Sequence, residues 1–288
     1  MGSAPRAPAV AGQFYPGGKA ELARAVEGCF TGGRGPGAVP TPSGAAGRRT
    51  VRAAVVPHAG YPFSGPIAAH VFAALGRETP PEAVVLLGVD HHGVGGLAAL
   101  SRRPWLTPLG TVPPARAIAS AVEIPPIAVD ESAHTLEHSI EVELPFLQRV
   151  WPAVPIVPIQ IHFASLAALN SVAEALRPGL AGRDVVVLAS SDFSHYEPAE
   201  IARAHDREML APLVAGDAAG LYELVRRRRY SMCGIAPVTV LLRYLAGEGV
   251  RGRLLAAGHS GEAAPMATVV GYAAVVFETP GGARPPVK

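Results

Sequence analysis

Short apolar segments alternate along the chain with longer segments whose apolar residues recur at helical spacing. The short segments lack polar alternation, which is typical of strands buried on both faces of a sheet. The predicted strands are 51–57, 84–88, 154–161, 184–189, 254–257 and 267–277. The predicted helices are 18–29, 65–75, 114–120, 137–150, 165–176, 198–213, 218–227 and 235–245. This order predicts an α/β fold, in which helices sandwich a mixed, largely parallel β-sheet.

Composition and length favour one domain over residues 1–288. Hydrophobic residues make up 49% of the chain and charged residues 17%, which excludes an intrinsically disordered protein. The composition does not change after Val51 in a way that would mark a domain boundary. Residues 31–49 are mostly Gly, Pro, Ala and Arg, so we expect a flexible surface loop there, and we expect a disordered tail over 279–288.

Charge and cysteine content narrow the class of protein. The formal net charge is +2, from 25 basic and 23 acidic residues, so no footprint for nucleic acid or membrane is expected. No uninterrupted apolar run reaches the roughly 18 residues of a spanning helix, and the N-terminus lacks a secretory pattern. Two cysteines cannot build a disulfide framework. We therefore expect a cytoplasmic protein.

Histidines gather where predicted strands end. His58 follows the first strand, Asp90, His91 and His92 follow the second, and Ser190 to Tyr196, with Asp192 and His195, follows the fourth. Loops at the carboxyl ends of parallel strands meet at one edge of the sheet, so these imidazoles are expected to share a cleft. Imidazole is a common ligand of iron, zinc, copper and nickel, and the pattern therefore favours a metal site.

The anionic ligand of such a site has several candidates on the residues alone. On a helix, Glu137, His138 and Glu141 would share one face and could line a pocket. Cys233 precedes an apolar helix whose N-terminus would favour the thiolate, although a free cysteine is more often a small buried hydrophobic residue. The candidates are Asp90, Asp192, Glu137, Glu141 and Cys233.

Several short motifs follow one another along the chain. They are Ala11-Gly12-Gln13-Phe14-Tyr15-Pro16, Pro57-His58-Ala59-Gly60-Tyr61, His91-His92, Glu137-His138-Ser139-Ile140-Glu141, Ser190-Ser191-Asp192-Phe193-Ser194-His195-Tyr196 and Cys233-Gly234. Taken together and in this order, they resemble the Memo family, protein B of the AmmeMemoRadiSam system. The resemblance implies the fold of the catalytic subunits of class III extradiol dioxygenases, which are non-haem Fe(II) enzymes.

The same resemblance implies site residues and a metal. The metal ligands fall on His58, His92 and Cys233, and Fe(II) is the expected ion, with copper or zinc as alternatives. The expected catalytic residues are His195, Asp192 and His138. The remaining candidates, as substrate-binding or supporting residues, are His91, Asp90, Tyr61, Glu137, Glu141 and Tyr196.

Two departures bear on function. Asp90 stands where the family usually has serine, which makes it a rival ligand, and Cys233 stands where the dioxygenases complete their site with a carboxylate. We predict an Fe(II)-dependent, dioxygenase-like redox enzyme acting on a small substrate. The alternatives are a non-catalytic adaptor that binds a metal or a peptide ligand, and a zinc-dependent hydrolase. The family further implies a pathway shared with radical-SAM and AMMECR-like proteins.

Overall fold

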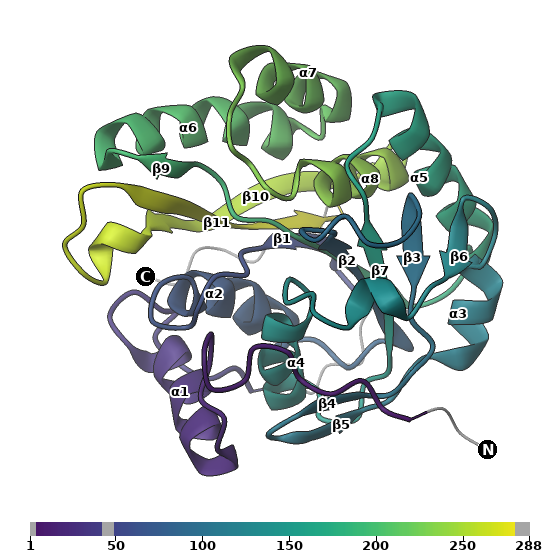
Figure 1. The fold of residues 1–288 in the computed structure, drawn as a ribbon, viewed down its shortest axis with the longest axis horizontal. Helices are drawn as coiled ribbons and strands as arrows, with labels where there is room; N and C mark the ends of the chain where they lie inside the picture. Colours follow the sequence, from purple (N-terminus) through teal and green to yellow (C-terminus); the bar gives the residue numbers. More distant parts are fainter. Residues whose placement is uncertain (1–3, 42–48, 280–288) are drawn as a thin grey trace.

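The computed structural model describes residues 4–41 and 49–279 and is built on a nine-stranded sheet (Figure 1). The strand order is β10-β11-β1-β8-β2-β7-β3-β6, and β9 pairs with β11 beside this path. Strands β4 and β5 form a separate two-stranded sheet. The strands are β1 (Val51–Val56), β2 (Ala83–Val89), β3 (Ala98–Leu100), β4 (Trp105–Thr107), β5 (Gly110–Val112), β6 (Ile127–Val129), β7 (Ile156–Ile161), β8 (Val185–Ser190), β9 (His195–Glu197), β10 (Arg251–His259) and β11 (Val269–Glu278).

The centre of the sheet is parallel and its flanks are mixed. Strands β1, β8, β2 and β7 run parallel to their neighbours in that order, whereas β11 is antiparallel to β1 and to β10, and β3 is antiparallel to β7. The predicted mixed, largely parallel sheet is confirmed. Because the four central strands point the same way, the segments that follow them meet at one edge of the sheet.

Helices cover both faces of the sheet (Figure 1). Helices α1, α2 and α4 pack on one face, and α3, α5, α6, α7 and α8 pack on the other. Along β1, Ala53 and Val55 pack on the face covered by α3 and α5 to α8, whereas Ala54 and Val56 pack on the face covered by α1, α2 and α4. This alternation is what strand geometry requires. The helices are α1 (Lys19–Thr31), α2 (Gly65–Leu75), α3 (Arg116–Val122), α4 (Leu144–Val150), α5 (Leu166–Leu180), α6 (Ala199–Ala215), α7 (Ala218–Arg228) and α8 (Ile235–Leu245).

One predicted helix is shorter than the pattern indicated. The expected helix over 137–150 starts at Leu144 as α4, after the 3-10 turn η2 (Glu141–Glu143). The carboxylate of Glu137 accepts hydrogen bonds from the backbone N–H groups of His138 and Ser139. Such local bonds compete with helical hydrogen bonding, so Glu137 and His138 lie in irregular backbone before the turn at Ser139 and Ile140, and the predicted shared helical face is wrong.

The predicted loop 31–49 is anchored on both sides of residues 42–48, which lie outside the described residues. The Arg34 guanidinium donates to the carbonyls of Pro62 and Phe63. The guanidinium of Arg49 is buried and pairs with Asp184 and Glu78. Most of the predicted tail, residues 280–288, also lies outside the described residues. Across the described ranges, the helices are too short or too polar to traverse a bilayer.

Candidate metal centre

Three side chains from distant parts of the sequence meet at the carboxyl edge of the sheet. His58 follows β1, His91 follows β2, and Cys233 precedes α8. One ligand atom from each residue lies within 4.8 Å of the other two. The rings of His58 and His91 meet edge to face with centroids 5.2 Å apart, and His58 Nε2 lies 3.3 Å from Cys233 Sγ. The predicted convergence of imidazoles and sulfur is therefore present in the fold.

The second histidine of this group is His91, whereas the resemblance placed the metal ligand on His92. Both residues are exposed, but their side chains have different partners: Nε2 of His92 lies 3.2 Å from the carbonyl oxygen of Leu136. His91 instead contacts the buried carboxylate of Glu137. Of the two rings, that of His91 has a nitrogen within 4.8 Å of the His58 and Cys233 ligand atoms. The tertiary contact with Glu137, which the sequence does not reveal, selects His91.

Glu137 orients His91 through two hydrogen bonds. The backbone N–H of His91 donates to Oε2 at 2.8 Å, and Nδ1 of the same ring lies 3.0 Å from Oε1. Burial alone would raise the pKa of Glu137, but its bond and charge interaction with His91 hold the pKa well below the ordinary value. The carboxylate is thus ionised, Nδ1 of His91 carries a proton, and Nε2 is left as the ligand atom.

His58 lies deeper and has a neutral partner. Only 2% of the residue is exposed, and its Nδ1 lies 2.8 Å from the hydroxyl of Ser190, the last residue of β8. Burial, followed by the neighbouring rings of His138 and His91, lowers the pKa of His58 well below its ordinary value. A neutral imidazole at this position has a lone pair to offer a metal.

Cys233 approaches His58 because glycine follows it. A Cβ on Gly234 would lie 2.4 Å from the Ser190 carbonyl oxygen, so glycine lets α8 begin against the end of β8. The backbone N–H of Asp192 donates to Sγ at 3.3 Å. Burial, and then the charge of Asp192, raise the pKa of the Cys233 thiol, against the expectation that the helix N-terminus would lower it. Desolvation outweighs the partial charge of the helix end here.

A pocket of about 440 Å³ is lined by two of the three ligand candidates, His58 and His91. The His138 ring stacks on His91 with centroids 4.7 Å apart, and burial lowers the pKa of His138 to about 4. Burial also raises the pKa of Asp192 to about 7, although its Oδ1 accepts a bond from the His58 backbone N–H at 2.8 Å. The pocket is lined by Gln13, Phe14, His58, Ala59, Gly60, Phe63, His91, His138, Asp192, His195, Tyr196 and Val270.

His195 and Tyr196 form one wall of this pocket. Nδ1 of His195 lies 2.8 Å from the Phe193 carbonyl oxygen and 2.9 Å from that of Ser231. Because both neighbours only accept hydrogen bonds, Nδ1 donates to them, which leaves Nε2 as the ring nitrogen without a part in these two bonds. Tyr196 is 81% exposed and has a φ of +62°, so the strand turns outward at the pocket mouth.

Asp90 and Glu141, two predicted members, serve other contacts. Asp90 Oδ2 lies 2.9 Å from Nδ1 of His162, and its Oδ1 accepts from the backbone of Val94. Glu141 is fully buried, forms an ion pair with Arg6 and accepts bonds from the backbone of Ala9 and Val10, so it fastens the N-terminal segment. The carboxylate oxygens that made these residues candidates already accept hydrogen bonds elsewhere.

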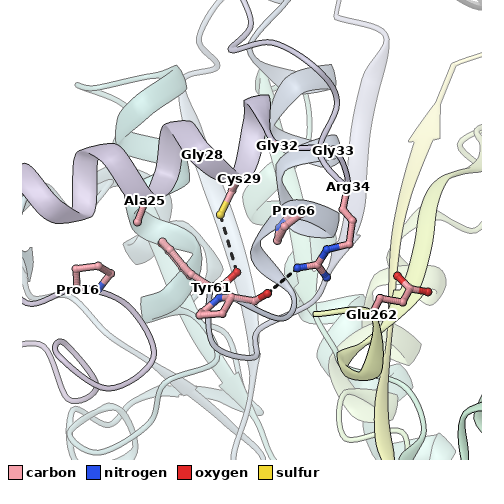
Figure 2. A pocket seen from close by; sticks show the side chains of 11 residues that line it. Pro16, Ala25, Gly28, Cys29, Gly32, Gly33, Arg34, Tyr61, Pro66 and Glu262 are labelled. Carbon is pink, nitrogen blue, oxygen red and sulfur yellow. Dashed lines mark hydrogen bonds between the residues drawn. The ribbon is translucent and has the colours of Figure 1, made fainter. Parts of the chain in front are cut away.

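Tyr61 faces away from the metal-ligand candidates. Its hydroxyl donates to the Val142 carbonyl, and its ring lies beneath α1 in a second pocket of about 540 Å³ with Cys29 and Arg34 (Figure 2). The Cys29 thiol lies 4.0 Å from the Tyr61 carbonyl oxygen. The turn of residues 60–63 contributes to both pockets, with Gly60 and Phe63 lining the first and Tyr61 and Pro62 the second.

A second possible metal-binding group shares the same corner. It consists of His91, Glu137 and His138. The Glu137 carboxylate already accepts bonds from the backbone of His91, His138 and Ser139 and from the His91 ring. Its lone pairs are therefore engaged in orienting the loop, whereas His58, His91 and Cys233 each bring one ligand atom within 4.8 Å of the other two. The first group fits a transition metal that accepts nitrogen and sulfur ligands.

The sequence did not predict Ser190 and Ser139 as residues that support the candidate metal centre. Ser139 Oγ accepts from the Val89 backbone N–H at 2.9 Å, and its carbonyl accepts from Ser190. The sequence does contain a weak indication, because both serines stand next to candidate site residues or at the end of a predicted buried strand. Serine is too common at such places for the sequence to distinguish support from chance.

Comparisons with known proteins agree along nearly the whole chain. Residues 6–276 match the family described as Memo-like protein. A MEMO1 family protein of Methanopyrus kandleri is 41% identical over 94% of this chain and 98% of its own, and one of Ignicoccus hospitalis is 42% identical over 96% and 99%. A crystal structure of an uncharacterised Escherichia coli K12 protein matches 79% of this chain and 99% of its own with a TM-score of 0.53 and 15% identity, which supports the fold alone.

Proposed function

The chain belongs to the Memo-like protein family, and from that premise we propose that it is a metal-dependent redox enzyme with one Fe(II) held by His58, His91 and Cys233. One observation carries this proposal. Two imidazole nitrogens and a sulfur converge within 4.8 Å beside an open pocket, with each imidazole held at its other nitrogen. A mixed nitrogen and sulfur set suits iron, copper or zinc, and three protein ligands leave positions for a substrate.

Bound Fe(II) would supply the capacity to bind and reduce dioxygen beside a small substrate. The chain's own residues would orient that substrate and move its protons. The neutral ring of His195 has Nδ1 committed to two carbonyls and can accept a substrate proton at Nε2. Asp192, with a pKa near 7, can hold or release a proton near neutral pH. His138 stacks on His91 and restricts the space beside it.

Metal analysis of matched variants tests the assignment of ligands. The protein is purified anaerobically, and iron, copper and zinc are measured in the wild type, His58→Ala, His91→Ala, Cys233→Ser and His92→Ala. We expect about one metal ion per wild-type chain and at least a roughly tenfold loss of affinity when a ligand is removed. His92→Ala should keep its metal, because that ring lies outside the group.

The metal and the oxygen chemistry are tested separately. Iron as the main metal, with oxygen uptake above that of free iron on a catechol panel, would support a dioxygenase-like enzyme. Zinc with oxygen-independent hydrolysis would support the hydrolase, and metal binding without turnover would support the adaptor. Undiminished occupancy in His58→Ala, His91→Ala and Cys233→Ser together would reject this centre.

A further inference from the structure

We infer that the hydroxyl of Ser190 fixes His58 in the tautomer protonated at Nδ1 and thereby directs the bare Nε2 toward Cys233. Ser190 is then a positioning residue of the centre. Only the consequence for metal affinity rests on the proposed function, because the tautomer is a property of the metal-free protein.

The inference begins with the single hydrogen of the Ser190 hydroxyl. Ser190 Oγ lies 2.8 Å from the Ser139 carbonyl oxygen and 2.8 Å from His58 Nδ1. A carbonyl oxygen can only accept, so the hydroxyl hydrogen goes to Ser139. Ser190 Oγ is then an acceptor toward His58, and Nδ1 must carry the proton.

Burial removes the opposite arrangement. Ser139 is 0% exposed and Ser190 is 1% exposed, so water does not compete freely for these groups. If the hydroxyl donated to His58 instead, the buried Ser139 carbonyl would lose the donor that Ser190 gives it. A buried acceptor without a partner is costly, which favours the arrangement that satisfies both groups.

Glu143 is the other neighbour of the Ser190 hydroxyl. Its side chain is hydrogen-bonded to Ser190, and its Oε1 is buried without a partner among the described residues. A protonated carboxyl can donate to Ser190 Oγ, which has two lone pairs, while the hydroxyl hydrogen stays with the Ser139 carbonyl. Ser190 Oγ therefore remains an acceptor toward Nδ1 of His58.

The consequence lies on the other side of the ring. With Nδ1 protonated, a neutral His58 has its lone pair on Nε2, 3.3 Å from Cys233 Sγ. The hydrogen bond at one imidazole nitrogen sets the tautomer and leaves the other as the ligand atom. Without the hydroxyl, Nε2 could carry the proton and would present a hydrogen to the centre.

Nitrogen-15 NMR of the histidine rings tests this directly in protein stripped of metal with EDTA. At pH 7.5 the wild type should show His58 with a protonated Nδ1 and an unprotonated Nε2. The signals are assigned by their absence in His58→Gln. In Ser190→Ala we expect the population protonated at Nε2 to rise, and Ser190→Thr, which keeps the hydroxyl, should preserve the wild-type tautomer.

Ser101→Ala is the matched control, because Ser101 is also fully buried and its hydroxyl bonds Glu131 and Trp105 away from the centre. Titration with Fe(II) should show affinity lowered about 10- to 100-fold in Ser190→Ala and unchanged in Ser101→Ala. A wild-type His58 protonated at Nε2 would overturn the inference, even if Ser190→Ala does not fold. If the wild type binds no metal, the proposed function is rejected. The inference about Ser190 is still tested by the His58 tautomer measured in the metal-free protein.

Discussion

The two imidazoles of the centre are held in opposite ways. The His91 side chain is 28% exposed and is backed by an ionised, fully buried carboxylate, Glu137. His58 is 2% exposed and is backed by the neutral hydroxyl of Ser190. Glu137 keeps its charge because four N–H groups point at it, whereas Glu143, the carboxyl behind Ser190, has one oxygen with no partner in the described part of the chain.

The difference shows that hydrogen-bond donors, rather than depth alone, decide where this fold tolerates charge. Both carboxyl groups are buried, yet the pKa of Glu137 lies well below the ordinary value and burial raises that of Glu143 to about 8. An ionised carboxylate is stable in the interior only when donors replace its water. The His91 side therefore supplies negative charge near the metal ligands, and the His58 side supplies a neutral hydroxyl.

Removing the charged partner should give the largest effect. Glu137→Ala leaves four N–H donors without their acceptor: the backbone groups of His138 and Ser139, and the backbone and ring of His91. We expect a loss of about 3–5 kcal/mol in unfolding free energy at pH 7, measured by urea denaturation. Glu137→Gln, which keeps the shape and one oxygen, should lose less. Equal stability of wild type and Glu137→Ala would mean that Glu137 is not the anchor of this side.

The neutral side should reveal itself by pH dependence. Folding raises the pKa of Glu143 from 4.5 to about 8, so between these values the native state binds more protons than the unfolded state. Its stability therefore falls as pH rises across that window, by about 1.4 kcal/mol per pH unit at most. In metal-free protein, Glu143→Gln should remove this pH dependence, so its unfolding free energy should rise relative to that of the wild type from pH 5 to pH 8. A constant difference between the two proteins would show that Glu143 does not titrate on folding.

The smallest expected effects on stability are those of replacing the two neighbouring histidines, His91 and His92. His91→Ala removes the side-chain donor to buried Glu137, whose Oε1 keeps the backbone N–H groups of His138 and Ser139, and should cost about 1–2 kcal/mol in metal-free protein. His92→Ala removes an exposed ring with one carbonyl contact, and its cost should stay within about 0.5 kcal/mol. Thermal denaturation of both variants in EDTA measures this difference. A larger loss of stability in His92→Ala than in His91→Ala would indicate that His92, rather than His91, is the ring held by the buried carboxylate.

Much of the fold follows from local pattern. The long apolar strands and seven of the eight predicted helices appear close to their expected bounds, because burial on one or both faces leaves a strong periodic signal. The three-residue strands β3, β4, β5, β6 and β9 were missed, since three residues contain no readable period. The helix expected from Glu137 failed because a carboxylate bonding its own backbone looks, in sequence, like an acidic helix start.

By itself, the sequence determined that several strands of a largely parallel sheet end in histidines, and the family resemblance added Cys233 to His58 and the His-His pair. Those conclusions depend on apolar pattern and motif identity, which are local properties of the chain. Only the tertiary structure decided that His91 faces inward, that Asp90, Tyr61 and Glu141 serve other contacts, and that Ser190 and Glu143 stand behind His58. Side-chain direction and hydrogen-bond partners arise from residues far apart in sequence, and no local pattern encodes them.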